Sequence, residues 1–330
     1  MTAFRAFRVF DEGGAVGGRV VSATLEELSP GDVVIKAAYS SVNYKDALAA
    51  TGTGKIVRRF PLIAGIDVSG TVESSADARF ATGDEVLVTG YDLGVAHDGG
   101  YAGRVRVPGE WVVPVPSALT LFDAMAIGTA GFTAALSVIE MEKNGLATAS
   151  GPVIVTGATG GVGSVAIQIL SARGYQVTAL TGKDGEHDYL RSLGAVNVLS
   201  RHGLGRGTRP LEKATWAGAV DAVGGDTLSW LTTTMMYNGC IASSGLAGGT
   251  HLQTTVLPFI LRGVKLLGID SVMCPMGTRR EVWKRLASDL KPPALPAIAR
   301  TIEMDALPDA FATLLAGGAR GRFVVKVGES

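Results

Sequence analysis

The most informative segment of the chain reads Val153-Ile-Val-Thr-Gly-Ala-Thr-Gly-Gly-Val-Gly-Ser164. A short β-branched run leads into a glycine-rich turn and then an apolar helical pattern. This order is typical of a strand, a tight loop and a helix N-terminus, whose backbone amides and dipole bind a pyrophosphate. The spacing G-x-G-x-x-G is met as Ala158-x-Gly160-x-x-Gly163, with alanine replacing the first glycine. Taken alone, the motif also fits an ordinary strand turn, but the complete β/α series around it favours nucleotide binding.

The composition predicts a globular protein of about two domains. The chain has 330 residues, of which 47% are hydrophobic, enough for sizeable cores. Its 45 glycines predict many tight turns. Lys plus Arg and Asp plus Glu number 30 each, so no overall charge favours nucleic acid or an anionic membrane. We therefore expect neither as a partner.

Cysteine usage and the N-terminus predict a cytoplasmic location. Cys240 and Cys274 are too few for a disulfide framework, and we expect both to be buried thiols. The N-terminal residues 1–10 lack a long apolar core followed by a small-residue cleavage site. No segment approaches the roughly 20 uninterrupted apolar residues of a membrane span.

The first part of the chain, residues 1–122, is typical of a compact β-rich domain. Short strands are expected at 33–37, 67–72 and 85–88, with a short helix at 43–50. A helical pattern follows over 122–142, with breaks expected at Gly128 and Gly131.

A β/α series then predicts a doubly wound parallel sheet. Strands are expected at 152–156, 176–180, 196–199, 219–223, 239–243 and 264–269, and helices at 162–173 and 186–193. A final strand at 322–327 returns to the first domain. We therefore predict an α/β protein with a β-rich domain of residues 1–122 and 295–330, and a nucleotide-binding Rossmann domain of residues 123–294.

The end of the second β/α strand favours NADP(H) over NAD(H). An NAD site usually carries a carboxylate there for the ribose hydroxyl. Here the strand ends in Thr181-Gly182-Lys183, and Arg201 follows the third strand. A hydroxyl and two cations suit a 2′-phosphate. The alternative is that Lys183 and Arg201 are ordinary surface charges.

The order of a β-rich domain, an inserted nucleotide domain and a C-terminal return resembles the medium-chain dehydrogenase/reductase superfamily, whose first domain is GroES-like. Zinc members carry a Cys-Gly-x-Asp and a Gly-His-Glu segment. The matching places are Asn43-Tyr-Lys-Asp46 and Gly65-Ile-Asp67, which lack the cysteine and the histidine. Asp46 and Asp67 alone cannot supply about three zinc ligands. We therefore predict no metal site.

Several segments are similar to one branch of this superfamily, the acryloyl-CoA reductases. Members of this branch are often called quinone oxidoreductases. The resemblance covers nearly the whole chain. The segments that carry it are Ser40–Leu48, Gly128–Ala134, Arg209–Lys213, Gly245–Gly249, Pro258–Arg262 and Gly268–Val272.

This resemblance implies a set of site residues. It places Asn43 and Tyr44 at the reactive end of the cofactor as catalytic residues. The resemblance and the motif together imply that the residues contacting NADPH/NADP⁺ are Tyr44, Thr129, Thr159, Gly160, Gly161, Val162, Thr181, Gly182, Lys183, Arg201, Leu246, Ala247, Ile269, Ser271 and Arg322.

The resemblance implies an oxidoreductase acting on CH–CH groups. Hydride from NADPH would reach the β-carbon of acryloyl-CoA, and donors aimed at the thioester oxygen would stabilise the developing enolate, giving propionyl-CoA. Asn43 suits an amide donor or an orienting role, and Tyr44 suits nicotinamide packing or proton delivery. The alternative is that both residues only pack against the cofactor and take no part in catalysis.

Two other functions fit the same scaffold. One is an NADPH quinone or enone reductase, which would ignore a CoA tail. The other is an NADPH-binding protein without turnover.

Further basic and titratable residues are candidates for contact with the substrate. Basic residues at 55, 58 and 59, and at 262, 279 and 280, would suit CoA phosphates, although such runs are usually solvated faces. His97 is expected to have an orienting or structural role rather than that of a proton relay.

The chain is expected to form a homodimer. The strand expected at 264–269 should lie at one edge of the nucleotide sheet, and exposed edges invite pairing. Relatives of this scaffold dimerise there, and a two-fold dimer is the commonest symmetric assembly.

Overall fold

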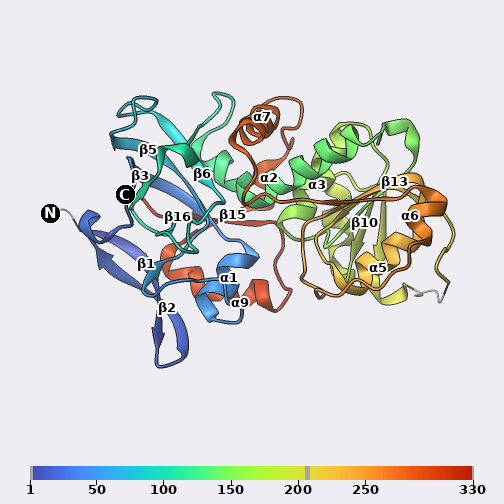
Figure 1. Cartoon of the computed structure of the whole chain (residues 1–330), viewed down its shortest axis with the longest axis horizontal. Coiled ribbons are helices and arrows are strands. Elements are labelled where there is room, and N and C mark those ends of the chain that lie inside the picture. Colours follow the sequence, from blue (N-terminus) through green and yellow to red (C-terminus); the bar gives the residue numbers. More distant parts are fainter. Residues whose placement is uncertain (1–2, 205–208, 329–330) are drawn as a thin grey trace. The chain divides into compact units, whose positions relative to one another are not determined.

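The computed structural model describes residues 3–204 and 209–328. Outside these ranges lie Met1, Thr2, Glu329 and Ser330 of the predicted first domain and residues 205–208 of the predicted nucleotide domain. The described chain divides into two compact units (Figure 1). Unit 1 contains Met1–Thr129, Val272–Ser288 and Leu295–Ser330, and unit 2 contains Ala130–Ser271 and Asp289–Ala294. The predicted boundary lies at 122/123 instead, and the predicted nucleotide domain includes residues 272–288.

The described part of unit 1 is built on two β-sheets. A seven-stranded sheet has the order β15-β16-β3-β5-β6-β8, with β7 also pairing with β3, and a three-stranded sheet has the order β2-β1-β4. The strands are β1 Phe4–Glu12, β2 Ala15–Ala23, β3 Val33–Ser41, β4 Leu62–Ile63, β5 Asp67–Ser75, β6 Glu85–Thr89, β7 Arg104–Val107, β8 Val113–Pro114, β15 Ala299–Glu303 and β16 Arg322–Lys326. The helices are α1 Tyr44–Thr51, α7 Met276–Leu286, α8 Leu295–Ile298 and α9 Leu307–Leu315.

Alternating side chains of these strands form one apolar core. On β3, for example, Val33 and Ile35 are fully buried, as expected for a strand with one face on a core. The Phe7 ring packs edge-on against Tyr101 and Phe311, with ring centroids 6.4 and 5.7 Å away. The core thereby ties β1 to α9 and brings the C-terminal segment into unit 1.

The segment that contains α7 is anchored in unit 1 by Arg279. Its Nη1 donates to the carbonyl oxygen of Thr89 at 2.8 Å, and its Nη2 donates to that of Val272 at 3.0 Å. The guanidinium also lies 4.6 Å above the ring of Tyr91. These contacts explain why residues 272–288 pack with unit 1, although they follow the last strand of unit 2.

Unit 2 has a doubly wound sheet. Its described residues form six strands in the order β11-β10-β9-β12-β13-β14, all pairs parallel. Figure 1 shows α3 and α5 on opposite sides of this sheet. The strands are β9 Val153–Thr156, β10 Val177–Thr181, β11 Asn197–Ser200, β12 Trp216–Asp221, β13 Met235–Ser243 and β14 Lys265–Gly268. The helices are α3 Gly161–Ala172, α4 His187–Ser192, α5 Gly225–Thr234 and α6 Leu257–Arg262.

Burial follows this sheet order. Every residue of β9 and β12 is buried, which is typical of central strands covered on both faces. The outer strands β11 and β14 are only partly buried. Because β14 is an edge strand, the position predicted for 264–269 is confirmed. Cys240 and Cys274 are both buried, as expected.

Helix α2, Leu121–Lys143, connects the two units in sequence. The backbone is non-helical at Gly128 (φ 52°, ψ −162°), so the break expected there is confirmed. The break expected at Gly131 is wrong, because the helix continues through that residue. Among the described residues, α2 alone is long and apolar enough to cross a membrane. However, 83% of its apolar 18-residue stretch is buried inside the protein. It is thus a core helix.

Candidate functional site

Unit 1 contains a buried polar centre, assembled where several elements begin or end. Ser41 ends β3, Asn43 is the N-cap of α1, and Asp67 begins β5. Arg322 begins β16, and Thr129 follows the non-helical Gly128. We call Ser41, Asn43, Asp67, Thr129 and Arg322 the polar centre. Three of them, Asn43, Thr129 and Arg322, are predicted site residues that the structure brings together.

The carboxylate of Asp67 lies at the middle of this centre and is completely buried. Its Oδ2 accepts hydrogen bonds from Ser41 Oγ (2.5 Å), Asn43 Nδ2 (2.8 Å) and the Thr129 amide (2.9 Å). Its Oδ1 accepts from Thr129 Oγ1 (2.5 Å). Arg322 Nη2 lies 3.8 Å from Oδ2. Four donors and a guanidinium suit the ionised carboxylate, which is an acceptor only.

A second buried carboxyl group, that of Asp46, borders the polar centre. It accepts hydrogen bonds from the backbone amides of Asn43 (2.9 Å) and Ile66 (3.0 Å). Burial, with a further contribution from the nearby negative charge of Asp67, raises the pKa of Asp46 to about 7. Burial likewise raises the pKa of Tyr101 well above its usual value. The Tyr101 hydroxyl donates to the carbonyl oxygen of Ser41 at 3.2 Å.

Gly128 allows the chain to pass this close to the polar centre. A Cβ at this position would lie 2.5 Å from Arg322 Nη2, 2.6 Å from Ser41 Oγ and 2.7 Å from Asp67 Oδ2. Its positive φ of 52° is also one that residues with a side chain rarely adopt. Both requirements explain why a glycine interrupts α2 here.

The two predicted catalytic residues differ in accessibility. Asn43 is only 7% exposed, and its amide is held inside the polar centre. Tyr44, the first residue of α1, is 37% exposed. The chain therefore presents a phenol at the surface directly beside a fixed amide. Their catalytic roles stay predictions.

In unit 2, the glycine-rich segment forms the predicted strand, loop and helix start. The loop lies between β9 and α3, with Gly160 as the N-cap of the helix. A Cβ on Gly163 would lie 2.5 Å from the carbonyl oxygen of Gly157, so the helix approaches the loop as expected. A Cβ on Gly160 would have no atom nearer than 3.3 Å. Thr159, Gly161 and Val162 belong to the same loop and first helical turn.

The residues predicted for a 2′-phosphate lie at the C-terminal ends of two neighbouring strands of the sheet, β10 and β11. Thr181 and Ser200 are paired at the ends of β10 and β11. The Arg201 guanidinium lies close to Gly182, since a Cβ there would be 3.0 Å from Arg201 Nη2. Lys183 follows directly, and burial lowers its pKa. Both predicted cations thus flank the end of β10.

The remaining predicted cofactor residues of unit 2 follow the C-terminal ends of β13 and β14, on the other side of the sheet's central strands. Ser243 of β13 pairs with Gly268 of β14, so the following loops leave the sheet side by side. The first loop carries Leu246, 53% exposed, and Ala247, and the second carries Ile269 and Ser271.

The loop after the central strand β12 is fixed by Asp221. Its carboxylate accepts from Thr156 Oγ1 (2.6 Å) and from the Gly224 amide (2.9 Å). Burial raises the pKa of Asp221. The ends of β9 and β12 are thereby joined at the centre of the edge, where open parallel sheets bind their ligands.

Several basic residues considered for CoA phosphates are engaged inside the protein. The Arg262 guanidinium donates to the backbone carbonyls of Thr233, Met235 and Glu212 at 3.0, 3.0 and 2.5 Å. Arg279 is fully buried. The guanidinium groups of these two residues are therefore held by carbonyl oxygens of their own units, and contact with CoA phosphates is not proposed for them.

The surroundings of His97 hold its ring in place, as expected for a residue with a structural or orienting role. It is buried, and its ring nitrogens lie 3.1 Å from the carbonyl oxygen of Asp98 and 2.9 Å from that of Pro30. Its ring also packs edge-on against Trp111.

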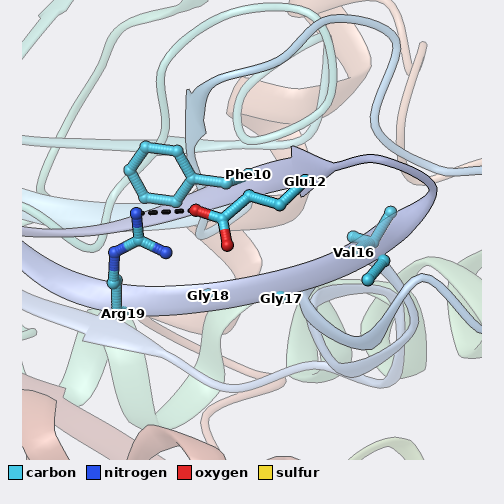
Figure 2. A pocket seen from close by; sticks show the side chains of 7 residues that line it. Phe10, Glu12, Val16, Gly17, Gly18 and Arg19 are labelled. Carbon is cyan, nitrogen blue, oxygen red and sulfur yellow. Dashed lines mark ion pairs between the residues drawn. The ribbon is translucent and has the colours of Figure 1, made fainter.

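A surface pocket lies on the β1–β2 hairpin (Figure 2). Arg19 pairs with Glu12 at 2.9 Å, and the Arg19 guanidinium lies 4.0 Å above the ring of Phe10. More than half of each charged side chain is exposed. None of the predicted site residues lines this pocket.

Sequence reasoning missed Ser41 and Tyr101, and treated Asp46 and Asp67 only as an incomplete zinc set. A partial signal was present, because Asp67 and Arg322 each begin a strand with an apolar second residue, and Asp46 precedes an apolar run in α1. Buried charges require partners, but the sequence alone does not show which of these charges meet. Within the described residues, no three His, Cys, Asp or Glu side chains gather in a way that could hold a metal ion.

Comparison with known proteins matches both units to dehydrogenase families. Residues 29–117 match the alcohol dehydrogenase GroES-like domain, and residues 161–290 match the domain called zinc-binding dehydrogenase. These matches confirm the predicted fold class.

Relatives match along the whole chain. The Bacillus subtilis protein named "Putative quinone oxidoreductase YhfP" is 50% identical over 99% of both chains. Acrylyl-CoA reductase AcuI of Ruegeria pomeroyi is 47% identical over 96% of both. The crystal structure of the YhdH oxidoreductase of Salmonella enterica in complex with NADP has a TM-score of 0.96 and 47% identity, covering 98% of this chain and 99% of that one. The chain therefore belongs to the medium-chain dehydrogenase/reductase family, in the zinc-free branch that includes AcuI and YhfP.

Proposed function

We propose that the protein catalyses NADPH-dependent reduction of the carbon–carbon double bond of acryloyl-CoA to propionyl-CoA. The observation that carries the proposal is the 47% identity to acrylyl-CoA reductase AcuI over 96% of both chains, which includes both units. The neighbouring side chains of Asn43 and Tyr44 support the proposal, because they place a fixed amide next to an accessible phenol.

The residues at the carboxyl edge of the unit 2 sheet fit a dinucleotide. The N-terminus of α3, free of any side chain at Gly160, suits a pyrophosphate. Lys183 and Arg201 flank the end of β10, and the carboxylate of Asp184, the residue after Lys183, accepts from Ser200 Oγ at 2.8 Å; the two cations favour NADPH over NADH. Similar proteins have been crystallised with NADP, and B. subtilis YhfP with NAD. When bound, the cofactor supplies the hydride.

The chain's own residues then stabilise charge and deliver a proton. The Asn43 amide suits the thioester oxygen, which becomes negative as the hydride reaches the β-carbon. The exposed Tyr44 phenol suits protonation of the α-carbon.

The first test is NADPH oxidation, followed by absorbance, with acryloyl-CoA, crotonyl-CoA and benzoquinone in parallel. Fast turnover of acryloyl-CoA alone is expected. Turnover of benzoquinone alone would contradict the proposal. It would support the second candidate, quinone reduction, which the name of YhfP favours. NADPH binding without turnover of any acceptor would instead favour a non-catalytic NADPH-binding protein.

We also propose a cytoplasmic homodimer that pairs along β14. This strand lies at the sheet edge, and the neighbouring α6 exposes Ile260 and Leu261. An exposed strand edge beside apolar side chains favours association. Light scattering after size exclusion should give twice the chain mass. A monomer at micromolar concentration would contradict this proposal.

A further inference from the structure

The amide of Asn43 is held between two groups of opposite charge. Its Nδ2 donates to Asp67 Oδ2 at 2.8 Å, and its Oδ1 accepts from Arg322 Nη1 at 3.2 Å. A carboxylate only accepts hydrogen bonds and a guanidinium only donates them. A flipped amide would therefore turn its oxygen toward the carboxylate and its NH₂ toward the guanidinium. Both contacts would be lost, so the amide has one orientation.

Arg322 is itself fixed by the same centre. Its Nη1 also donates to the carbonyl oxygen of Val42 (3.0 Å), its Nη2 donates to Ser41 Oγ (2.7 Å), and its Nε donates to the carbonyl oxygen of Ala126 (3.3 Å). The side chain is 3% exposed. The family resemblance assigns Arg322 to the cofactor, and that assignment stays a prediction. In the structure its N–H groups face protein acceptors.

The backbone before α1 is held as firmly as the amide. The Val42 amide donates to the carbonyl oxygen of Phe323 (2.9 Å), and the Asn43 amide nitrogen donates to Asp46 Oδ2 (2.9 Å). Asn43 therefore has little freedom to move relative to β16. Tyr44, the next residue, begins the helix from this fixed point.

From this geometry we propose that Asp67 and Arg322 are positioning residues, which act on the reaction by holding the Asn43 amide in a single orientation. The inference rests on the proposed function of Asn43 as a donor to the reacting oxygen. This role requires no contact of the ion pair with substrate or cofactor. Its contribution reaches the reaction through Asn43.

A double-mutant cycle on kcat separates positioning from general stability. Residues that act as one unit show strongly non-additive losses. Asn43→Ala should lower kcat about 100-fold, as does loss of one oxyanion donor. Asp67→Asn should lower kcat about 10- to 100-fold, because one acceptor oxygen is replaced by an NH₂ that opposes the donors of Ser41, Asn43 and Thr129. The combined variant should match Asn43→Ala within about twofold. Losses that multiply would overturn the proposal.

Asp98 supplies a matched control in unit 1. Its buried carboxylate also accepts from the Ser29 amide and hydroxyl, from the Ile63 amide and from Arg59 Nη2, at 2.8–2.9 Å. Asp98→Asn should therefore lower thermal stability as Asp67→Asn does. It should leave kcat nearly unchanged, and its small effect should multiply with that of Asn43→Ala. A kcat loss equal to that of Asp67→Asn would show that any buried ion pair of this unit has the same effect, and would overturn the proposal.

Two further measurements keep the proposal testable if a variant fails. Should Asp67→Asn not fold, Arg322→Lys takes its place in the cycle, because it keeps the charge but cannot reach all the acceptors of the guanidinium. NADPH affinity should change much less than kcat in Asp67→Asn, because the substitution leaves unit 2 intact. A change confined to KM or to NADPH affinity would overturn the positioning role.

A measurement without turnover distinguishes failure of this proposal from failure of the proposed function. The side-chain NH₂ of Asn43, followed by NMR in the full chain, should exchange slowly and become faster in Asp67→Asn. If the unsubstituted protein reduces no acceptor but this difference appears, the assigned reaction is wrong while the orientation of the amide stands. Equal exchange rates in the two proteins would overturn the positioning pair.

Discussion

In unit 2, the candidate nucleotide site is a product of the backbone: six parallel strands end at one edge, and glycines leave room between β9 and α3. In unit 1, the polar centre is a product of side chains, and its members come from β3, the start of α1, β5, α2 and β16. The first arrangement depends on local conformation. The second depends on charges that meet only in the folded chain, so a substitution that separates them, by charge or by shape, should affect it.

The largest expected effect is that of Gly128→Ala. The new Cβ would meet three polar-centre side chains at 2.5–2.7 Å, at a φ that alanine rarely adopts. We expect a loss of about 3 kcal/mol or more in the free energy of unfolding, measured with urea. The matched control is Gly277→Ala in α7, where a Cβ meets nothing within 4 Å and which should be neutral or slightly stabilising. Equal stability of the two variants would contradict the close approach.

A pair of glycine substitutions separates shape from binding in unit 2. Gly163→Ala places a Cβ 2.5 Å from the carbonyl oxygen of Gly157, so it should lower the free energy of unfolding by about 2 kcal/mol. Gly160→Ala brings its Cβ only to 3.3 Å from the same oxygen and should cost less stability, but it should bind NADPH at least about tenfold more weakly, because the Cβ would stand where the phosphates are expected to approach. Fluorescence titration measures the affinity. Unchanged NADPH affinity in Gly160→Ala would place the pyrophosphate elsewhere.

Removing the two cations should change cofactor preference. Lys183→Ala and Arg201→Ala should each weaken NADPH binding about tenfold, the loss of one charge-assisted hydrogen bond, and leave NADH binding nearly unchanged. The comparison of dissociation constants for the two cofactors measures this. Equal losses for both cofactors would show that neither cation contacts a 2′-phosphate.

The smallest expected effect is a pH dependence of stability due to Asp46. Its pKa is raised to about 7 from an ordinary value near 4, so between these values the folded state binds a proton that the unfolded state has released. Stability from this group is therefore present at low pH and is lost as pH rises through about 7. From pH 6 to 8, the wild type should lose on the order of 1 kcal/mol relative to Asp46→Asn in urea unfolding. Parallel pH profiles would contradict burial of an ionisable Asp46.

The parts of the fold set by local pattern were predictable. The expected strands at 152–156 and 176–180 are β9 and β10 within one residue at each end. Their β-branched runs, and the glycine turn between them, leave few alternative conformations. Gly131 shows the limit of this approach, because tertiary packing of α2 outweighs the low helix propensity of glycine.

The polar centre could be predicted only in part. The resemblance to the family picked out Asn43, Thr129 and Arg322 one by one, but no pattern in the sequence shows that all three meet Asp67. The same limit explains Arg262, whose charge suited a phosphate but whose guanidinium instead caps three backbone carbonyls. Which acceptors surround a cation depends on segments far away in the chain.

The position of Arg322 has a consequence for synthesis of the protein on the ribosome. It lies 279 positions after Asn43, and β16, which it begins, pairs with both β3 and β15 in the seven-stranded sheet. The whole of the unit 2 sheet leaves the ribosome before that strand does. Until then Asp67 has no guanidinium partner, and β3 lacks its neighbour. The nucleotide-binding unit is therefore able to fold during translation, whereas unit 1 has to await the end of the chain.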